Sequence, residues 1–231
     1  QVAGYSVTES PRQVRQRVGI LTEQPGLYLR MRGKEYLHFY GQLTGLETAE
    51  CTRRGQALLD RLGMPEAWER RIGTFSKGMR QKMALVRALL HDPAVLLLDE
   101  PTSAMDPLSA RLVRDAVLEL RDGRRAIVWC THNLPEAEQV CDRMAIIRNG
   151  RIVALGTPAE LKARLLGPPL MELRLAQAAD GVAHLLAGLV HVEAHGSDWL
   201  RYSCADPSLT NPQVVRRLAY HGVQVITLSE V

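Results

Sequence analysis

The segment 95–98 is an uninterrupted apolar run, Val-Leu-Leu-Leu, that ends directly in two carboxylates, Asp99 and Glu100. Apolar runs of this length without polar alternation are typical of a strand that is buried on both faces, as in a parallel sheet. Helical patterns precede this run as far as His91 and follow it from Pro107. The sequence therefore predicts an α/β fold, with a mainly parallel sheet covered by helices on both faces.

Hydrophobic periodicity and turn residues place the other elements of this part of the chain. Ser10-Pro11 predicts the start of a short helix, because serine caps helices and proline fits their first turn. Asn149-Gly150 is a strong two-residue hairpin signal, and residues 2–5 are expected to form the tail of a strand. The expected helices cover 11–17, 33–43, 48–62, 76–91, 107–121 and 135–140, and the expected strands cover 18–21, 95–98, 126–129, 143–148 and 151–155.

The pattern changes near Gly167-Pro168-Pro169, where we place a domain boundary. We expect domain 1–166 to hold the α/β fold, with a helical subdomain at about 26–90, and domain 167–231 to be a small accessory unit. The expected elements of the second domain are strand 170–175, helix 182–189, strands 191–195 and 199–205, helix 212–221 and strand 223–228. Asn211 is expected to cap the last helix and Gly222 to end it. This βαββαβ order predicts a ferredoxin-like α+β domain.

Composition limits the classes of partner. The 231 residues are 46% apolar, which is ordinary for a folded protein, and carry a mild net charge of +4. We expect no nucleic-acid partner from this charge. Three arginine pairs are expected to be solvated faces, with a docking surface for acidic lipid headgroups or a membrane partner as the weaker alternative. These pairs are Arg53-Arg54, Arg70-Arg71 and Arg124-Arg125.

Cysteine spacing and hydropathy argue against a cysteine metal site and against a transmembrane span. The four cysteines form no C-x-x-C pair, so we expect free thiols rather than a metal site. No apolar run approaches 18 residues and no signal-peptide pattern is present, so no transmembrane span is expected. Because the first residue is Gln rather than Met, the sequence is expected to begin inside a longer chain.

The carboxylates after the 95–98 run are the first candidate site. Open α/β sheets bind ligands at the carboxyl ends of their strands. We expect Asp99 to hold a magnesium ion through water and Glu100 to orient or deprotonate an attacking water. A phosphate-binding G-x-x-x-x-G-K-[ST] loop is not found in the sequence. The nearest candidate, Gly33-Lys34, is followed by Glu35 and has Tyr28 where the first glycine should be.

Four motifs, in matching order and spacing, resemble those of the ATP-binding cassette (ABC) family. FSKGM at 75–79 resembles the LSGGQ signature, and LLLDEPTSAMDP contains a Walker B strand, a catalytic glutamate and a D-loop at 103–106. His132, after the strand sequence AIVWCT, resembles the family's switch histidine. The resemblance extends over about residues 2–162. It implies a phosphate-loop NTPase core that is incomplete in this chain, with a helical subdomain and the ferredoxin-like domain behind it.

The resemblance also implies roles for individual residues. In the family, two cassettes meet head to tail, and the signature of one closes over ATP held by the other. The signature residues Ser76, Lys77, Gly78 and Met79 would then face the γ-phosphate, with the helix N-terminus favouring its negative charge. Lys77 and Met79 depart from LSGGQ, and a plain helix cap is the alternative role of Ser76.

Several other residues are expected at the same nucleotide. His132 would contact the γ-phosphate and position water and Glu100. Asp99 would bind the metal ion. Either Glu23, which stands at the family's Q-loop glutamine, or Gln24, one position later, would reach the metal or the nucleotide. The D-loop residues implied at the site are Ser103 and Asp106.

The same resemblance implies ATP and Mg²⁺ as cofactors, a second cassette as head-to-tail homodimer partner, and a transmembrane permease subunit. The SKGM-type signature, the segment GILTEQPGLY and the ferredoxin-like tail are similar to ATPase subunits of exporters with a separate permease. Such a subunit lies at the cytoplasmic face of the cell membrane. The family places the phosphate-loop strand upstream of Gln1 and beside strand 95–98, so this strand is expected to expose an unpaired edge.

Three functions remain open at this point. The chain is part of an ATPase that drives export, or it is a non-catalytic, degenerate or scaffold cassette, or it belongs to a soluble ABC ATPase outside transport. The aligned motifs favour the first function for the whole protein. The missing loop leads us to expect that these 231 residues alone do not hydrolyse ATP.

Overall fold

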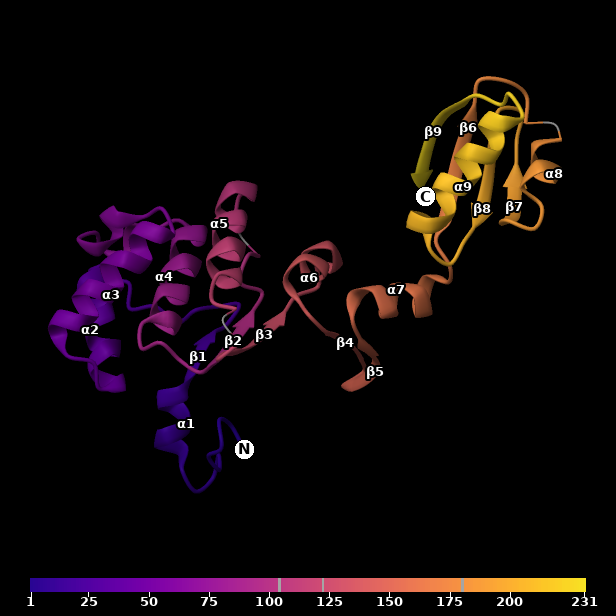
Figure 1. Ribbon diagram of the computed structural model, residues 1–231. Helices are drawn as coiled ribbons and strands as arrows, with labels where there is room; N and C mark the ends of the chain where they lie inside the picture. The colour runs from indigo at the N-terminus through magenta and orange to yellow at the C-terminus, as the bar shows by residue number, and fades with distance from the viewer. Residues whose placement is uncertain (104, 122, 180) are drawn as a thin grey trace. The chain divides into compact units, whose positions relative to one another are not determined.

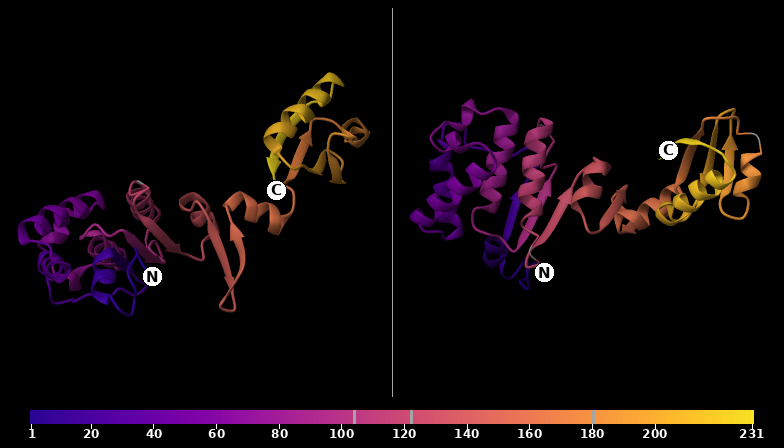
Figure 2. Two further views of the ribbon diagram at one scale, coloured as in Figure 1. Left: turned by 60° about the horizontal axis from the view of Figure 1, so that its bottom comes forward. Right: turned by 45° about the horizontal axis from the view of Figure 1, so that its top comes forward.

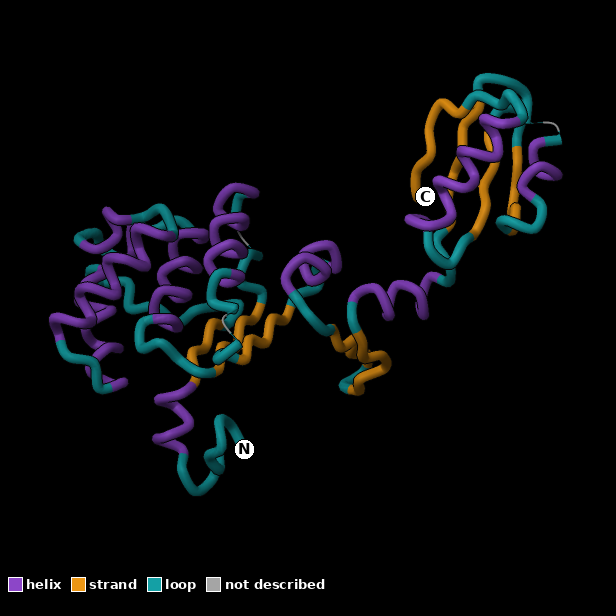
Figure 3. The backbone as a smooth tube through the Cα atoms, viewed as in Figure 1, coloured by secondary structure: helices purple, strands orange, loops and turns teal. Residues whose placement is uncertain are grey.

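The structure is a computed structural model that describes residues 1–103, 105–121, 123–179 and 181–231. The chain forms two compact units, Gln1–Cys141 and Asp142–Val231, which are described separately here (Figures 1 and 3). The domain boundary that the sequence predicts between residues 166 and 167 stays a prediction. Within the described residues, no helix is both long and apolar enough to cross a membrane.

The first unit alternates helices and strands much as the sequence predicts. Residues 2–5 are an exception, because Val2 and Tyr5 form only an isolated antiparallel bridge across a turn instead of a strand. The elements of this unit are α1 (Pro11–Arg17), β1 (Val18–Leu21), α2 (Gly33–Thr44), α3 (Thr48–Arg61), η1 (Pro65–Trp68), η2 (Ile72–Thr74), α4 (Lys77–Leu89), β2 (Val95–Asp99), α5 (Pro107–Leu118), β3 (Ala126–Cys130) and α6 (Leu134–Val140).

The three strands form a parallel sheet in the order β1-β2-β3. β2 is therefore the central strand, and the expectation that segment 95–98 would expose an unpaired edge is wrong. The strand after α5 supplies the missing neighbour, since Leu96 lies opposite Ile127 and Asp99 lies opposite Cys130. In a parallel sheet all carboxyl ends lie at one edge, so the residues that follow β1, β2 and β3 are brought together.

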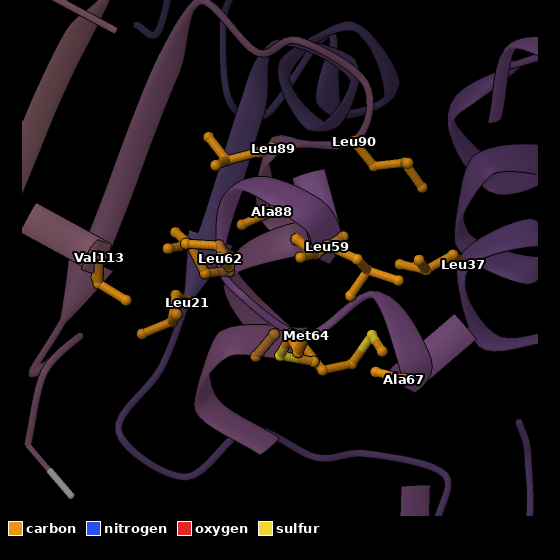
Figure 4. Close-up of a cluster of buried hydrophobic side chains, with 14 of the residues drawn as sticks. Leu21, Leu37, Leu59, Leu62, Met64, Ala67, Ala88, Leu89, Leu90 and Val113 are labelled. Carbon is orange, nitrogen blue, oxygen red and sulfur yellow. The ribbon is translucent and has the colours of Figure 1, made fainter. Parts of the chain in front are cut away.

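One face of this sheet is covered by α4 and α5 (Figures 1 and 2). Gly19 on β1 permits close packing of α4, because a Cβ at this position would lie 2.2 Å from the carbonyl oxygen of Ala88. Leu21 and Leu98 are 1% exposed on this face. Both belong to a core that includes Leu62 and Val113. Figure 4 shows Leu21, Leu62 and Val113 among the side chains of this core.

The opposite face of the sheet is open, so the expectation of helices on both faces is wrong. Ile20, Leu97 and Val128 are partners in register across the three strands, and they are 48%, 36% and 50% exposed. We call these three residues the apolar face. An apolar run predicts a strand in a parallel sheet, but it cannot say which of its faces is covered in a given stretch of chain.

The second unit contains a hairpin, a helix and an antiparallel sheet. Its elements are β4 (Met144–Arg148), β5 (Arg151–Gly156), α7 (Pro158–Leu166), β6 (Leu170–Leu175), α8 (Val182–Leu186), β7 (His191–His195), β8 (Trp199–Ser203), α9 (Pro207–Tyr220) and β9 (Val225–Glu230). The sheet order β7-β8-β6-β9 and the βαββαβ sequence confirm the ferredoxin-like expectation. One face of this sheet packs against α8 and α9 through residues such as Leu173, Leu200 and Leu218.

The start of α9 differs from the expectation. The helix begins at Pro207, five residues early, and the cap is Asp206, whose side chain accepts a hydrogen bond from the Ser208 amide at 2.9 Å. Asn211 therefore does not cap the helix. Its Oδ1 instead accepts a hydrogen bond from the buried Tyr202 hydroxyl at 2.7 Å. The pair Asp206-Pro207 is itself a cap and first-turn proline, so a competing start signal lay upstream.

Candidate active site

The carboxyl ends of β2 and β3 carry the acidic and histidine residues of the candidate site. Asp99 ends β2 with an exposed side chain, and Glu100 follows it as the strand turns into a loop. His132 lies two residues beyond the end of β3. The Glu100 amide donates to the Cys130 carbonyl at 2.9 Å, so the two strand ends are held together by one further backbone bond.

Glu100 and His132 form a direct pair. The Oε1 atom of Glu100 accepts a hydrogen bond from the His132 amide at 2.9 Å and lies 2.7 Å from His132 Nδ1. Glu100 has a φ of +46°, a left-handed conformation that is rare for a residue with a side chain and that clusters at functional sites. The expectation that these two residues meet is therefore supported by contact geometry.

Two neighbours fix the backbone of Glu100. The Ser103 amide donates to the Glu100 carbonyl oxygen at 3.2 Å, and Gln81 Nε2 of α4 donates to the same oxygen at 3.3 Å. Gln81 is 3% exposed and did not figure among the residues expected from the sequence. The sequence feature that could have identified Gln81 is its position on the apolar side of the predicted helix. A polar side chain buried there requires a hydrogen-bond partner.

Glu100 is the main cause of a raised pKa at His132. The hydrogen bond to Glu100 and then its negative charge raise the pKa of His132, and the charges of Glu23 and Glu136 act in the same direction. The influence of Glu23 shows that the loop after β1 contributes to the same electrostatic environment. His132 itself has an 85% exposed side chain, whereas the Glu100 side chain is 18% exposed.

The candidate metal ligands fit a magnesium ion that keeps part of its water shell. Carboxylates such as Asp99 and Glu23 are the ligands that Mg²⁺ prefers. Within the described ranges, however, no group of three or more His, Cys, Asp or Glu side chains is placed to hold a metal ion. The backbone carbonyl of Gln24 accepts a hydrogen bond from the Thr22 hydroxyl of the same loop at 3.2 Å. Magnesium at Asp99 would therefore take its other ligands from water or from a phosphate.

The signature residues lie at the N-terminus of α4. Ser76 is the N-cap of this helix, and its Oγ accepts a hydrogen bond from the Met79 amide at 3.2 Å. The side chains of Ser76 and Lys77 are exposed, whereas Met79 packs partly against the core. Among the described residues, no hydrogen bond or ion pair joins residues 76–79 to Asp99, Glu100 or His132. A site formed with a second molecule would use the exposed side of this helix end.

Two D-loop residues, Ser103 and Asp106, form hydrogen bonds between β2 and α5, whereas Ala104 lies outside the described residues. Asp106 caps α5 by accepting a hydrogen bond from the Ser109 amide at 2.9 Å, and these bonds lower the pKa of Asp106. Ser103 contacts the Glu100 backbone as described above. Both residues thus have local structural roles beside the roles that the resemblance implies.

Comparisons with known proteins identify the family. A family model described as ABC transporter matches residues 1–103. The ABC transporter ATP-binding protein NatA of Bacillus subtilis is 39% identical over 156 residues, which are 67% of this chain and 63% of NatA. The daunorubicin/doxorubicin resistance ATP-binding protein DrrA of Streptomyces peucetius is 35% identical over 197 residues, 84% of this chain and 59% of DrrA. The chain thus spans about three-fifths of the length of these curated relatives.

A solved structure described as the ATP binding subunit of an ABC transporter gives the same answer in three dimensions. It is 31% identical in sequence, has a TM-score of 0.66, and the match covers 71% of this chain and 68% of that chain. The parallel sheet, the motif order and the antiparallel second sheet agree with the fold class expected from the sequence. The chain belongs to the ABC transporter family, among its ATP-binding proteins.

Proposed function

We propose that this chain supplies catalytic and metal-binding residues of an ATPase that drives export. The observation that supports this proposal most strongly is the Glu100–His132 pair next to Asp99, at the ligand-binding edge of a parallel sheet. A carboxylate held by an imidazole, beside a second carboxylate suited to Mg²⁺, is the equipment of a phosphoryl-transfer site.

In the proposed mechanism, each residue has one task. Bound ATP and Mg²⁺ supply the γ-phosphoryl group and neutralise its developing charge. Glu100 orients the attacking water and accepts its proton, while Asp99 would hold the metal ion through water. His132 keeps the Glu100 carboxylate in place through Nδ1, which leaves Nε2 as the nitrogen that donates to a phosphate oxygen.

The partners follow from the same proposal. Ser76, Lys77, Gly78 and Met79 would face the γ-phosphate held by a second cassette in a head-to-tail homodimer, with Ser103, Asp106 and Glu23 or Gln24 lining the interface or nucleotide. A transmembrane permease would couple hydrolysis to transport at the cytoplasmic face of the membrane. The family relationship supports a transport role, and the resistance function in the name of DrrA supports export.

Substitution of Glu100 in the assembled transporter tests the catalytic proposal. We expect Glu100→Gln to reduce ATP turnover by at least about 10²–10⁴-fold, because an amide cannot accept the proton, and to trap an ATP-bound dimer. Glu138→Gln makes the same chemical change at an exposed position of α6 and should leave turnover unchanged. Normal turnover in Glu100→Gln would remove this residue from the catalytic role.

A second candidate function is a non-catalytic cassette that donates its signature helix to a partner. It is favoured by one observation, the lack of any G-x-x-x-x-G-K-[ST] match within these 231 residues. For this stretch by itself we expect weak ATP binding and no magnesium-dependent hydrolysis, because no lysine and amide cradle holds the triphosphate. Calorimetric titration of the chain with ATP measures the affinity. Robust hydrolysis by this stretch would contradict the second candidate.

A further inference from the structure

A buried carboxylate outside the proposed chemistry lies directly behind the Glu100–His132 pair. Glu136 on α6 is 4% exposed, which makes it, with Gln81 and Lys82, one of the few polar side chains buried among the described residues. An ionised carboxylate is costly to bury unless its oxygens are paired. The partners of Glu136 therefore indicate what its burial achieves.

These partners come from three separate elements. Oε1 of Glu136 accepts a hydrogen bond from the Thr102 hydroxyl at 2.7 Å and lies 3.5 Å from an Arg114 guanidinium nitrogen on α5. Oε2 accepts a longer bond from the Thr131 hydroxyl at 3.4 Å. One carboxylate thus bridges the loop after β2, the loop after β3 and helix α5.

The two threonines are immediate neighbours of the pair. Thr102 is two residues after Glu100, and Thr131 immediately precedes His132. Thr131 Oγ1 also accepts from the Asn133 amide at 3.1 Å, and the Asn133 side chain accepts from the Glu136 amide at 3.3 Å. The loop that carries His132 is therefore tied to Glu136 from both sides.

We propose that Glu136 is a positioning residue that holds the loops after β2 and β3 in register, so that Glu100 and His132 keep their contact. A buried ion pair of this kind contributes little net stability compared with apolar residues, whereas it can fix one arrangement of the groups around it. The catalytic meaning of this arrangement rests on the proposed function, but the arrangement itself does not.

Thr102→Val tests the proposal without changing any charge. It removes the 2.7 Å bond to Glu136 and nearly preserves the side-chain volume. We expect the His132 amide, which donates to Glu100 Oε1, to exchange with solvent about tenfold faster by NMR, the order expected for losing one hydrogen bond to a charged group. Thr102→Ser keeps the hydroxyl and should restore the wild-type exchange rate.

Glu136→Gln should show the same faster exchange at His132, and the ladder amides of β2 and β3 serve as the control. If those ladder amides accelerate equally, Glu136 acts on the stability of the whole unit and the positioning proposal is overturned. An unchanged His132 rate in Thr102→Val also overturns it.

In the assembled transporter we expect Thr102→Val to lower kcat about 10–100-fold with KM unchanged. A wild-type complex without turnover would refute the proposed function, while the exchange experiment would still decide the role of Glu136.

Discussion

The two sheets of this protein are each covered by helices on one face, but their open faces differ in chemistry. The parallel sheet presents the apolar face of Ile20, Leu97 and Val128. The open face of the antiparallel sheet carries Glu172, whose carboxylate accepts hydrogen bonds from Arg201 at 2.7 and 2.9 Å and from Arg174 at 3.2 Å.

The open face of the antiparallel sheet is therefore suited to contact with water, whereas the apolar face of the parallel sheet is not. Antiparallel sheets commonly keep one polar, solvated face, and the arginine–glutamate contacts fit that arrangement. Parallel sheets are normally buried on both sides, so an apolar open face means that burial in the first unit is incomplete in this chain. The candidate site lies at the edge of the incompletely buried sheet.

The largest stability difference is expected between neighbouring leucines of β2. Leu98 is 1% exposed on the covered face, so Leu98→Ala should lower the free energy of unfolding by about 2–5 kcal/mol. Leu97 is 36% exposed on the apolar face, and Leu97→Ala should cost less than half as much. Denaturant unfolding of both variants gives the comparison. Equal losses would mean that the two faces are equally buried.

Helix caps provide the next largest effect. Ser76 caps α4, which covers the parallel sheet, and Asp206 caps α9, which covers the antiparallel one. Ser76→Ala and Asp206→Ala should each lower the free energy of unfolding by about 1 kcal/mol. Only Ser76→Ala should also reduce ATP turnover in the assembled transporter, if the signature faces a phosphate. Unchanged turnover would leave Ser76 with its capping role alone.

Exposure of the apolar face should be visible with a hydrophobic dye. Val128→Thr places a hydroxyl on this face, and we expect weaker binding of 8-anilinonaphthalene-1-sulfonate than in the wild type. Fluorescence titration of the folded chain measures the effect. If Val128→Thr binds the dye as well as the wild type does, the bound dye lies elsewhere.

The smallest effect is expected at the polar open face of the antiparallel sheet. Arg201 donates hydrogen bonds to Glu172 and lowers its pKa, but the Arg201 side chain is 37% exposed and Arg174 also contacts Glu172, at 3.2 Å. Arg201→Gln should therefore change neither dye binding nor the denaturation midpoint measurably at neutral pH. A clear loss of stability would show that this face depends on its ion pairs.

The sequence predicted the site best where local pattern and topology coincide. The strands before Asp99 and His132 were recognisable, and parallel strands must bring the residues after them to one edge. Gln81, Thr102 and Glu136 were missed because their roles depend on contacts between elements that are distant along the chain. Hydrophobic periodicity identifies a helix and its buried side, but not the partner of a single buried polar group.

The errors in the fold have similar causes. The central position of β2 depends on which strand pairs with it, and no residue within 95–98 encodes that choice. Helix α7 escaped prediction although Thr157 and Glu160 form a capping box at its start, with a Thr157 amide to Glu160 distance of 2.8 Å. Asn211 has a side chain typical of a helix cap, but it lies inside α9, where its Oδ1 accepts a hydrogen bond from the Tyr202 hydroxyl.

The most direct test of the account is the titration of His132 in the wild type and in Glu100→Gln. The chain has seven histidines, so His132→Gln assigns the NMR signal. Glu100 favours the protonated imidazole of His132. The pair therefore stabilises the fold fully at pH values below the ordinary histidine pKa of about 6.5. This contribution is lost as pH rises through the raised pKa of His132.

We predict that the His132 pKa lies above its ordinary value in the wild type and falls in Glu100→Gln. Glu138→Gln on the exposed side of α6 should leave it unchanged. The same His132 pKa in the wild type and in Glu100→Gln would contradict the pairing on which the proposed site depends.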